Sequence, residues 1–323
     1  MAILGRRGVL AAALTAAAGC APRFALPGPA VGAPRDEGEA FVMPDGARLP
    51  LTVWPAEGPA RGVILALHGF NDYRRAFEIP APLFTAAGWT VLAYDQRGFG
   101  AAPHPGLWPG HAALAADAID AARLTRARFP GLPLVLLGES MGAAVLLLAG
   151  AAETPPPADA YVLSAPAVWG GEAMGDIGRA ALRTLAHIVP QLGFANASPF
   201  HRPSDNDAAL AAMARDPLVL RYTRVDALWG LVQAMDAALE AARSFPHPAL
   251  ILYGGRDDLV PPRAIEALAA RLPGLASGQQ RLIRYSDGYH LLLRDSIRTR
   301  VVSDILAWLE SGAGGLAGRA ASS

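Results

Sequence analysis

Three residues, in the chain order serine, aspartate and histidine, could together carry out nucleophilic catalysis. Ser140 is the central residue of GESMG (138–142), which follows the apolar run LVLL and precedes the apolar run AAVLLLAG. A glycine on each side of a serine permits a tight, strained strand-to-helix turn that lifts the hydroxyl clear of a sheet. The alternative is a serine that only caps the following helix, but a cap does not need both glycines. The context therefore favours Ser140 as a nucleophile.

A serine hydroxyl needs a base to take its proton and a carboxylate to orient that base. Asp257 follows the apolar run ALILYGG, and His290 follows RLIRYSDGY near the C-terminal end of the chain. The order serine, acid, histidine is typical of hydrolases that use such a turn. Asp258 is the alternative acid. We prefer Asp257 because it is the first carboxylate after the strand, and we expect Asp258 to cap the turn before Pro261.

Acyl transfer also requires N–H donors that face the negative oxygen of the tetrahedral intermediate. One donor is the backbone N–H after the nucleophile, here Met141. The other comes from a loop after an early strand, here LHGFND (67–72), in which Phe70 is the candidate and His68 is expected to support the loop. The remaining histidines are expected in loop, capping, cap-surface or turn positions: His104, His111, His187, His201 and His247.

The elements that must position these residues alternate between strand and helix. The first extended runs flank a Pro-Asp-Gly turn in FVMPDGARLPLTVW (41–54), which predicts an antiparallel hairpin. Six later runs are apolar at nearly every position, as in strands buried on both faces of a parallel sheet: RGVILALHGF, WTVLAYDQRGFG, LPLVLLGES, ADAYVLSAPAV, HPALILYGGRDD and QQRLIRYSDGYH. Helical patterns lie between them, so the sequence predicts an α/β fold with its site at the carboxyl ends of the strands.

The alternation stops between residues 168 and 245, where two helical patterns have no predicted strand between them. We interpret 168–245 as an inserted helical cap on a core formed by 40–167 and 246–312, with a frayed tail at 313–323. Apolar cap residues could line a pocket for an acyl chain, although each could equally pack the cap against the core: Trp169, Met174, Phe194, Phe200, Trp229 and Met235.

Residues 1–20 have the layout of an export signal, with two arginines followed by a short apolar stretch. This stretch is too short to span a bilayer. Cys20 follows Ala-Ala-Gly, which resembles a bacterial lipoprotein signal, in which the cysteine is lipidated and becomes the new N-terminus. The alternative is ordinary secretory cleavage next to a bystander cysteine. Residues 21–39 suit a tether, so we expect a membrane-anchored protein of the bacterial cell envelope.

Composition excludes several other classes of function. The chain has 28 basic and 28 acidic residues and a formal net charge of zero, so it has no sign of a nucleic-acid-binding surface. It contains no H-E-x-x-H motif, phosphate-binding loop or dinucleotide fingerprint, and we expect neither a metal nor an organic cofactor. Its single cysteine excludes an internal disulfide and a cysteine-based zinc cluster. We expect a monomer.

Five segments together resemble one family: HGFND, DQRGFG, GESMG, GGRDDLVP and the C-terminal YH. They look like the monoacylglycerol lipase and lysophospholipase branch of the α/β-hydrolases, also called serine aminopeptidase-like hydrolases. The resemblance runs from residue 41 to 310, and RDPLV (215–219) resembles a segment of that family's cap. It implies an α/β-hydrolase fold with a mostly parallel central sheet flanked by helices. It also implies a triad of Ser140, Asp257 and His290 that cleaves monoacylglycerol- or lysophospholipid-like esters.

Two other functions remain open at this point. An aminopeptidase would need a cap carboxylate to hold the substrate ammonium, and Glu172, Asp176 and Asp236 are the candidates. A non-catalytic envelope protein could keep the fold, although every catalytic position is filled. A dehalogenase or epoxide hydrolase is disfavoured because those enzymes use aspartate where this chain has Ser140.

Overall fold

In the computed structural model, residues 21–196 and 201–311 are described, and the predicted export signal, Cys20 and the predicted tail from 313 lie outside them. The described residues form a nine-stranded sheet in the order β1-β2-β3-β5-β4-β6-β7-β10-β11. Its central strands run parallel. They are β5 (Trp89–Tyr94), β4 (Gly62–Leu67), β6 (Leu134–Glu139), β7 (Ala160–Ser164), β10 (Ala249–Gly254) and β11 (Gln280–Tyr285). The predicted mostly parallel sheet is confirmed.

An antiparallel edge precedes the parallel strands. It consists of β1 (Arg35–Asp36), β2 (Ala40–Val42) and β3 (Arg48–Trp54), and β3 pairs antiparallel with β5. The predicted hairpin is therefore present. The segment predicted as a tether lies along the surface, where the Ala25 N–H donates to the Trp108 carbonyl at 2.9 Å and the Val31 N–H to the Pro44 carbonyl at 2.7 Å. Its last residues contribute β1.

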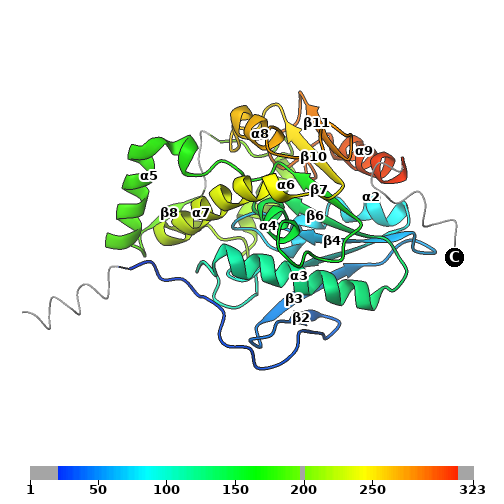
Figure 1. Ribbon diagram of the computed structural model, residues 1–323, viewed down its shortest axis with the longest axis horizontal. Helices are drawn as coiled ribbons and strands as arrows, with labels where there is room; N and C mark the ends of the chain where they lie inside the picture. The colour runs from blue at the N-terminus through cyan, green and yellow to red at the C-terminus, as the bar shows by residue number, and fades with distance from the viewer. Residues whose placement is uncertain (1–20, 197–200, 312–323) are drawn as a thin grey trace, which may run out of the picture.

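Two apolar layers cover the sheet because successive side chains of a strand point to opposite faces. Along β4, Val63 and Leu65 belong to one hydrophobic cluster, whereas Ile64 and Ala66 belong to the other. The first cluster includes side chains of α3 (His111–Arg128), α4 (Met141–Gly150) and α8 (Pro262–Ala269). The second includes side chains of η1 (Arg74–Phe77), α2 (Ala81–Ala86) and α9 (Arg298–Glu310). Figure 1 shows where α2 and α9 lie.

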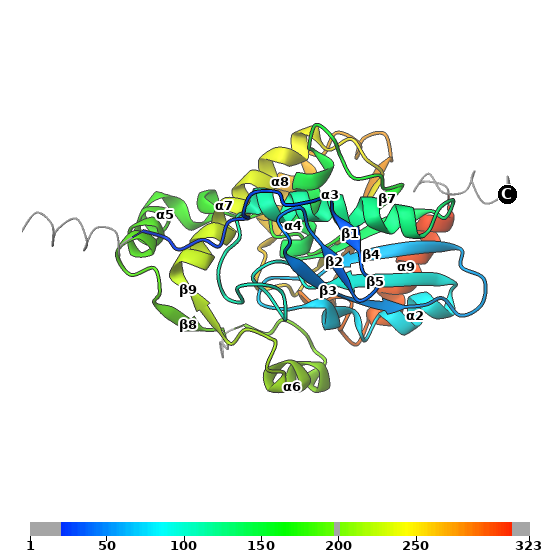
Figure 2. The ribbon, with the colours of Figure 1, turned by 90° about the horizontal axis from the view of Figure 1, so that it is seen from below.

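The cap extends from one end of this core (Figure 2). It contains α5 (Gly171–Ile188), α6 (Asp207–Arg215) and α7 (Val225–Ala241), and the short η2 (Ala242–Ser244) leads back to the core. The expectation of no strand in this region is wrong, because β8 (Gly193–Ala195) and β9 (Tyr222–Arg224) form an antiparallel pair. Strands of three residues are too short to show a period of two. None of the described helices is long and apolar enough to cross a bilayer.

Candidate active site

The loops that carry the candidate residues all leave the same edge of the sheet. β4 ends before His68, β6 before Ser140, β10 before Asp257 and β11 before His290. Because these strands run parallel in one sheet, their carboxyl ends lie along the same edge, which is where open α/β sheets place ligand sites. The topology therefore brings together segments that are up to 222 residues apart, as in the ion pair between Asp72 and Arg294.

Ser140 lies at a strained turn between β6 and α4. Its backbone has φ 54° and ψ −111°, a conformation that is unfavourable for a residue with a Cβ. The Ser140 N–H donates to the Ser164 carbonyl at 2.9 Å, which ties the turn to the neighbouring strand β7. This is the nucleophile elbow that the G-x-S-x-G motif predicts, and it holds the serine at the edge of the sheet.

The two glycines of the motif are required by close packing at this turn. A Cβ on Gly138 would lie 2.5 Å from the Ala143 nitrogen, and a Cβ on Gly142 would overlap the Leu67 carbonyl oxygen. Both obstacles are backbone atoms, which cannot rotate away as a side chain can. The glycines therefore let α4 begin directly against the ends of β6 and β4.

The structure brings Asp257 and His290 into contact. Asp257 Oδ2 lies 2.8 Å from His290 Nδ1, and both side chains are buried. The other carboxylate oxygen, Oδ1, accepts the N–H groups of Leu259 and Val260, each at 2.9 Å. The turn before Pro261 is thus capped by Asp257 and not by Asp258, contrary to our expectation. Asp258 instead accepts the N–H of Arg202 at 2.8 Å.

The charges around His290 favour its protonated form. Burial alone lowers the pKa of His290, but the charge of Asp257, its hydrogen bond and the charge of Glu139 together outweigh burial and the opposing charge of Arg294. The pKa of His290 is therefore raised above its ordinary value of 6.5. An imidazole with a raised pKa is a stronger base toward a serine hydroxyl.

Ser140 and His290 line one cavity of about 560 Å³, together with Gly69 and Phe70 of the loop after β4. Among the described residues, nothing accepts a hydrogen bond from the backbone N–H of Phe70. Met141 is the first residue of α4, so its N–H has no acceptor within the helix. Both candidate oxyanion donors are consequently free to bind a ligand oxygen.

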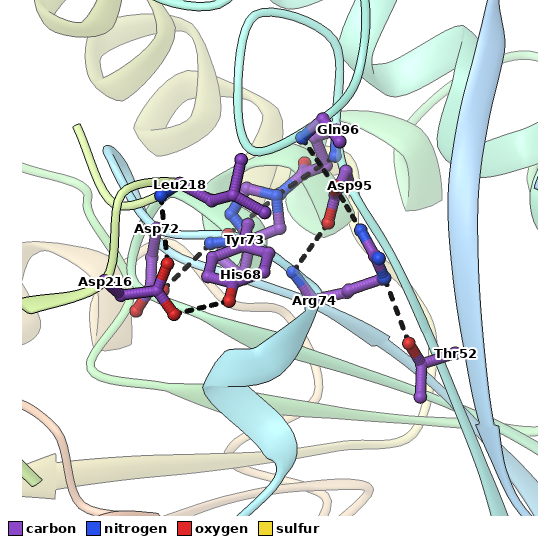
Figure 3. A network of polar contacts seen from close by, with 10 residues as sticks. Thr52, His68, Asp72, Tyr73, Arg74, Asp95, Gln96, Asp216 and Leu218 are labelled. Atoms are coloured by element: carbon purple, nitrogen blue, oxygen red, sulfur yellow. Dashed lines mark hydrogen bonds and ion pairs between the residues drawn. The ribbon is translucent and has the colours of Figure 1, made fainter. Parts of the chain in front are cut away.

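His68 holds the oxyanion loop in place, as we predicted (Figure 3). Its Nδ1–H donates to the Gly69 carbonyl at 2.8 Å, and its Nε2 accepts the Gln96 N–H at 3.0 Å. The Gln96 side-chain amide donates to the His68 carbonyl at 2.8 Å. Complete burial lowers the pKa of His68, which keeps the ring neutral and able to accept at Nε2.

The same loop is bonded to the cap. The Tyr73 hydroxyl donates to Asp216 at 2.6 Å, and Figure 3 shows this pair beside Leu218. The Asn71 side-chain amide donates to the Thr223 hydroxyl of β9 at 2.7 Å. Asp216 belongs to RDPLV (215–219), the segment that resembles the family's cap. The cap is therefore anchored directly on the loop that offers the Phe70 donor.

A family model described as "Serine aminopeptidase, S33" matches residues 58–297, which is most of the chain. The chain belongs to this hydrolase family. The match begins after β3 and ends before α9, so it covers the parallel strands β4 to β11 and the whole cap. It agrees with the resemblance seen in the five sequence segments.

Curated relatives and solved structures agree with this membership. The chain is 28% identical over 280 residues to a monoacylglycerol lipase of Mycolicibacterium smegmatis, covering 84% of this chain and 96% of that protein. It is 26% identical to human monoglyceride lipase over 279 residues, covering 83% and 89% respectively. A crystal structure of a Saccharomyces cerevisiae monoglyceride lipase variant with a substrate analogue superposes with a TM-score of 0.72. That structure is 20% identical, with coverage of 88% of this chain and 98% of the other, and it supports the α/β-hydrolase fold.

Within this family fold, the cavity is lined largely by apolar side chains. Of the cap residues that we expected there, Trp169, Phe194 and Met235 line it, whereas Met174 is exposed and Trp229 borders a separate groove between α5 and α7. Phe200 lies outside the described residues. Further apolar lining comes from Ala167, Val219, Leu220, Leu228, Leu231, Leu259 and Leu291.

Two of the cap carboxylates considered for an aminopeptidase, Asp176 and Asp236, are not among the described residues that line this cavity. Asp176 borders the separate groove. Asp236 accepts the Gly171 N–H at 2.8 Å and pairs with Arg179 at 3.3 Å. The Glu172 side chain is not among the described atoms.

The other five histidines that we expected in loop, capping, cap-surface or turn positions are not among the described residues that line the cavity. His104 is in an exposed loop, and His111 begins α3. His187 contacts the Arg183 carbonyl on α5, and His201 lies 3.8 Å from Asp258. His247 contacts the Gly150 carbonyl at 2.8 Å.

Our sequence reasoning missed three charged residues that also line the cavity: Asp72, Glu139 and Arg294. Each of them is buried. A signal was present, because Glu139 ends an otherwise apolar strand and Arg294 follows the apolar run LLL (291–293). Charges in buried segments require partners, but sequence alone does not say which partner each one has.

Proposed function

We propose that this protein hydrolyses carboxylic esters of lipids with a single acyl chain, such as monoacylglycerols or lysophospholipids, through an acyl-enzyme on Ser140. The observation that carries the proposal is the cavity itself. It contains the serine and the Asp257-bound histidine, and its other walls are mostly aliphatic and aromatic. An apolar pocket of this kind suits an acyl chain, and the few polar groups at its base fix the reacting carbonyl.

In this mechanism, His290 takes the proton of Ser140 as the hydroxyl attacks the ester carbonyl. Asp257 holds the proton on Nδ1 of His290 and stabilises the imidazolium that forms. The N–H groups of Phe70 and Met141 stabilise the oxyanion. His290 then donates its proton to the departing alcohol, and a water molecule, deprotonated by His290, releases the fatty acid and restores Ser140.

Aminopeptidase activity, which the family description names, is the second candidate. It requires a negative group to hold the ammonium of the substrate. The carboxylates that line the cavity besides the triad are Asp72 and Glu139, and Arg294 pairs with both. The ester function is therefore preferred.

A labelling and turnover experiment distinguishes these functions. The protein lacking residues 1–20 is treated with a fluorophosphonate probe beside Ser140→Ala, and both are assayed on monoacylglycerols of rising chain length and on aminoacyl amides. We expect labelling only of the wild type, with turnover of esters. Labelling of Ser140→Ala excludes Ser140 as the nucleophile, turnover of amides alone supports a peptidase, and no labelling or turnover supports a non-catalytic protein.

We also propose that Cys20 is lipidated and anchors a monomeric enzyme in the bacterial cell envelope. The described chain begins beside the cap, since the Arg23 N–H donates to the Asp226 carboxylate at 3.0 Å and the Asp226 N–H donates to the Pro190 carbonyl at 3.2 Å. The first described residues, which directly follow Cys20 in the sequence, therefore lie beside α5 and the cap (Figure 2).

Exposed apolar side chains on this part of the cap support the membrane proposal. We define the cap face as Ile177, Leu185, Ile188, Val189, Leu192 and Phe194, all of which are exposed. Such a face next to a lipid anchor supplies the second signal that stable membrane binding needs. Metabolic labelling with an alkynyl fatty acid, with Cys20→Ala as the control, tests the anchor. Equal labelling of both proteins contradicts it, and light scattering of the signal-free protein tests the monomer.

A further inference from the structure

A buried ion cluster lies beneath the catalytic residues. Arg294 Nη1 donates to Asp72 at 2.6 Å, and Arg294 Nη2 donates to Glu139 at 2.5 Å. The side chain of Arg294 is 4% exposed, that of Asp72 7% and that of Glu139 1%, so all three charges are shielded from water. We call Asp72, Glu139 and Arg294 the Arg294 cluster.

Each member of the cluster belongs to a different segment of the site. Asp72 is two residues after the oxyanion donor Phe70, Glu139 directly precedes Ser140, and Arg294 is four residues after His290. The two nitrogens of one guanidinium thus join the oxyanion loop and the nucleophile elbow to the histidine loop. A planar guanidinium binds two carboxylates at fixed angles, so it constrains orientation as well as distance.

The oxyanion loop packs closely against the nucleophile elbow. A Cβ at Gly69 would be 3.4 Å from the Ser140 Cβ, so the oxyanion loop passes directly over the elbow. Asp72 is held on its own loop, where Oδ1 accepts the Tyr73 N–H at 2.9 Å. Arg294 also contacts the Met213 sulfur of α6 at 3.3 Å, which brings the cap into the same assembly.

We propose that Arg294 is a positioning residue that sets the distance of the Phe70 N–H and the Ser140 hydroxyl from His290. Shifts of about 1 Å at a reacting centre cost on the order of 100-fold in rate, so a link across all three loops has a direct effect on turnover. The proposal rests on Ser140 as the nucleophile, and Ser140→Ala labelled in parallel separates a failure of that assignment from a failure of the positioning role.

The chain contains a matched control for a purely structural role. Arg97 is also buried and pairs with two carboxylates, Asp45 and Asp117, both at 2.6 Å. Neither Arg97 nor its partners line the catalytic cavity. Arg97→Lys and Arg294→Lys therefore disturb equivalent ion clusters, but only the second one joins catalytic loops.

Charge and geometry can be separated because the charged groups facing His290 are known. Besides burial, which lowers the pKa of His290, the charges of Asp257 and Glu139 raise it and the charge of Arg294 lowers it, and Asp72 pairs with Arg294. Arg294→Met should raise the pKa of His290 and move the acid limb of kcat/KM to higher pH. Glu139→Gln should lower it and move the limb to lower pH. Arg294→Lys keeps the charge, so the acid limb of kcat/KM should stay at the same pH, while the plateau value of kcat/KM should fall.

The experiment measures kcat and KM on a short-chain nitrophenyl ester from pH 5 to 9, the rate of fluorophosphonate labelling, and Tm. For Arg294→Lys we expect kcat and the labelling rate to fall by about 10- to 100-fold with KM changed less than about threefold. Arg97→Lys should keep wild-type kcat even if its Tm falls by a similar amount. A single ammonium cannot place two nitrogens on two carboxylates, which is why lysine does not restore the rate.

Three results would overturn the proposal. The first is an Arg294→Lys plateau within twofold of the wild type. The second is an equal loss of kcat in Arg97→Lys. The third is an acid limb that stays fixed in both Glu139→Gln and Arg294→Met. If Arg294→Met does not fold, Glu139→Gln and Arg294→Lys still decide the outcome, because one removes a charge and the other preserves it.

Discussion

The carboxylate of Asp257 binds His290 with one oxygen and its own loop with the other. Oδ2 is 2.8 Å from His290 Nδ1, while Oδ1 accepts the N–H of Val260 at 2.9 Å. Because both oxygens are engaged, the carboxylate is held in one orientation, in which Oδ2 accepts a hydrogen bond from the Nδ1–H of His290. This leaves the lone pair on Nε2 of His290 as the base.

Asp257→Asn should reduce kcat by roughly 1,000- to 10,000-fold, because an amide stabilises the wrong tautomer and cannot stabilise the imidazolium. Asp258→Asn is the matched control, since Asp258 bonds to Arg202 and not to the histidine. We expect this control to stay within a few-fold of the wild type. Steady-state kinetics on a soluble ester measures kcat of both variants. A larger loss of kcat in Asp258→Asn would assign the carboxylate of the triad to Asp258 and not to Asp257.

The pH profile of kcat/KM should have its acid limb above pH 6.5. Burial lowers the pKa of His290, but Asp257 and Glu139 raise it further, so the net shift is upward. Only the neutral imidazole acts as a base, so activity falls as the pH drops through this raised pKa. A midpoint at or below 6.5 in the wild type would contradict the electrostatic assignment.

Gly142→Ala should both destabilise the protein and reduce its activity. The added methyl group would overlap the Leu67 carbonyl, so α4 must move away from the end of β4. Overpacking of this kind costs about 1 to 3 kcal/mol in the free energy of unfolding. Gly32→Ala is the control, because a Cβ there has no atom within 4 Å. Denaturant unfolding measures the free energy of unfolding of both variants. An equal loss of this free energy in the two variants would contradict a role for the close approach between α4 and β4.

The core fold could be predicted from sequence because its signals are local. Each buried strand is a short apolar run, and the turn at 43–46 carries its own Pro-Asp-Gly signature. The Asp257 and His290 positions followed from the chain order that an elbow requires. The pairing of β8 with β9 was not predictable in the same way, since three-residue strands have no recognisable period.

The role of Arg294 was also beyond sequence reasoning, for a different reason. Its partners are 222 and 155 residues away along the chain. The sequence indicated that Glu139 and Arg294 were charges among apolar neighbours, but only the topology of the sheet shows that they meet. Non-local ion pairs between loops leave no spacing pattern.

Leu231→Trp should shorten the preferred acyl chain. Leu231 lies on α7 and lines the cavity, so a larger side chain takes space that a long acyl chain would use. We expect kcat/KM for long-chain monoacylglycerols to fall at least about tenfold relative to short-chain esters, equivalent to about two buried methylene groups. Val31→Trp, at an exposed position outside the cap, is the control. A uniform loss at every chain length would instead indicate damage to the site.

Binding of the signal-free protein to lipid vesicles should depend on the cap face. Ile177 is 87% exposed and Ile188 59%, and both lie on α5, beside the point where the described chain begins. Because a carboxylate is strongly disfavoured at the acyl boundary, Ile177→Asp with Ile188→Asp should weaken sedimentation with vesicles by at least about tenfold. Val31→Asp is the control. Val31 is 76% exposed, and its N–H donates to the Pro44 carbonyl, which places it at the N-terminal hairpin and not on the cap. Turnover of a soluble short-chain ester should be unchanged in the double variant, because neither isoleucine lines the catalytic cavity. Equal sedimentation of the double variant and Val31→Asp would leave Cys20 as the sole proposed contact with the membrane.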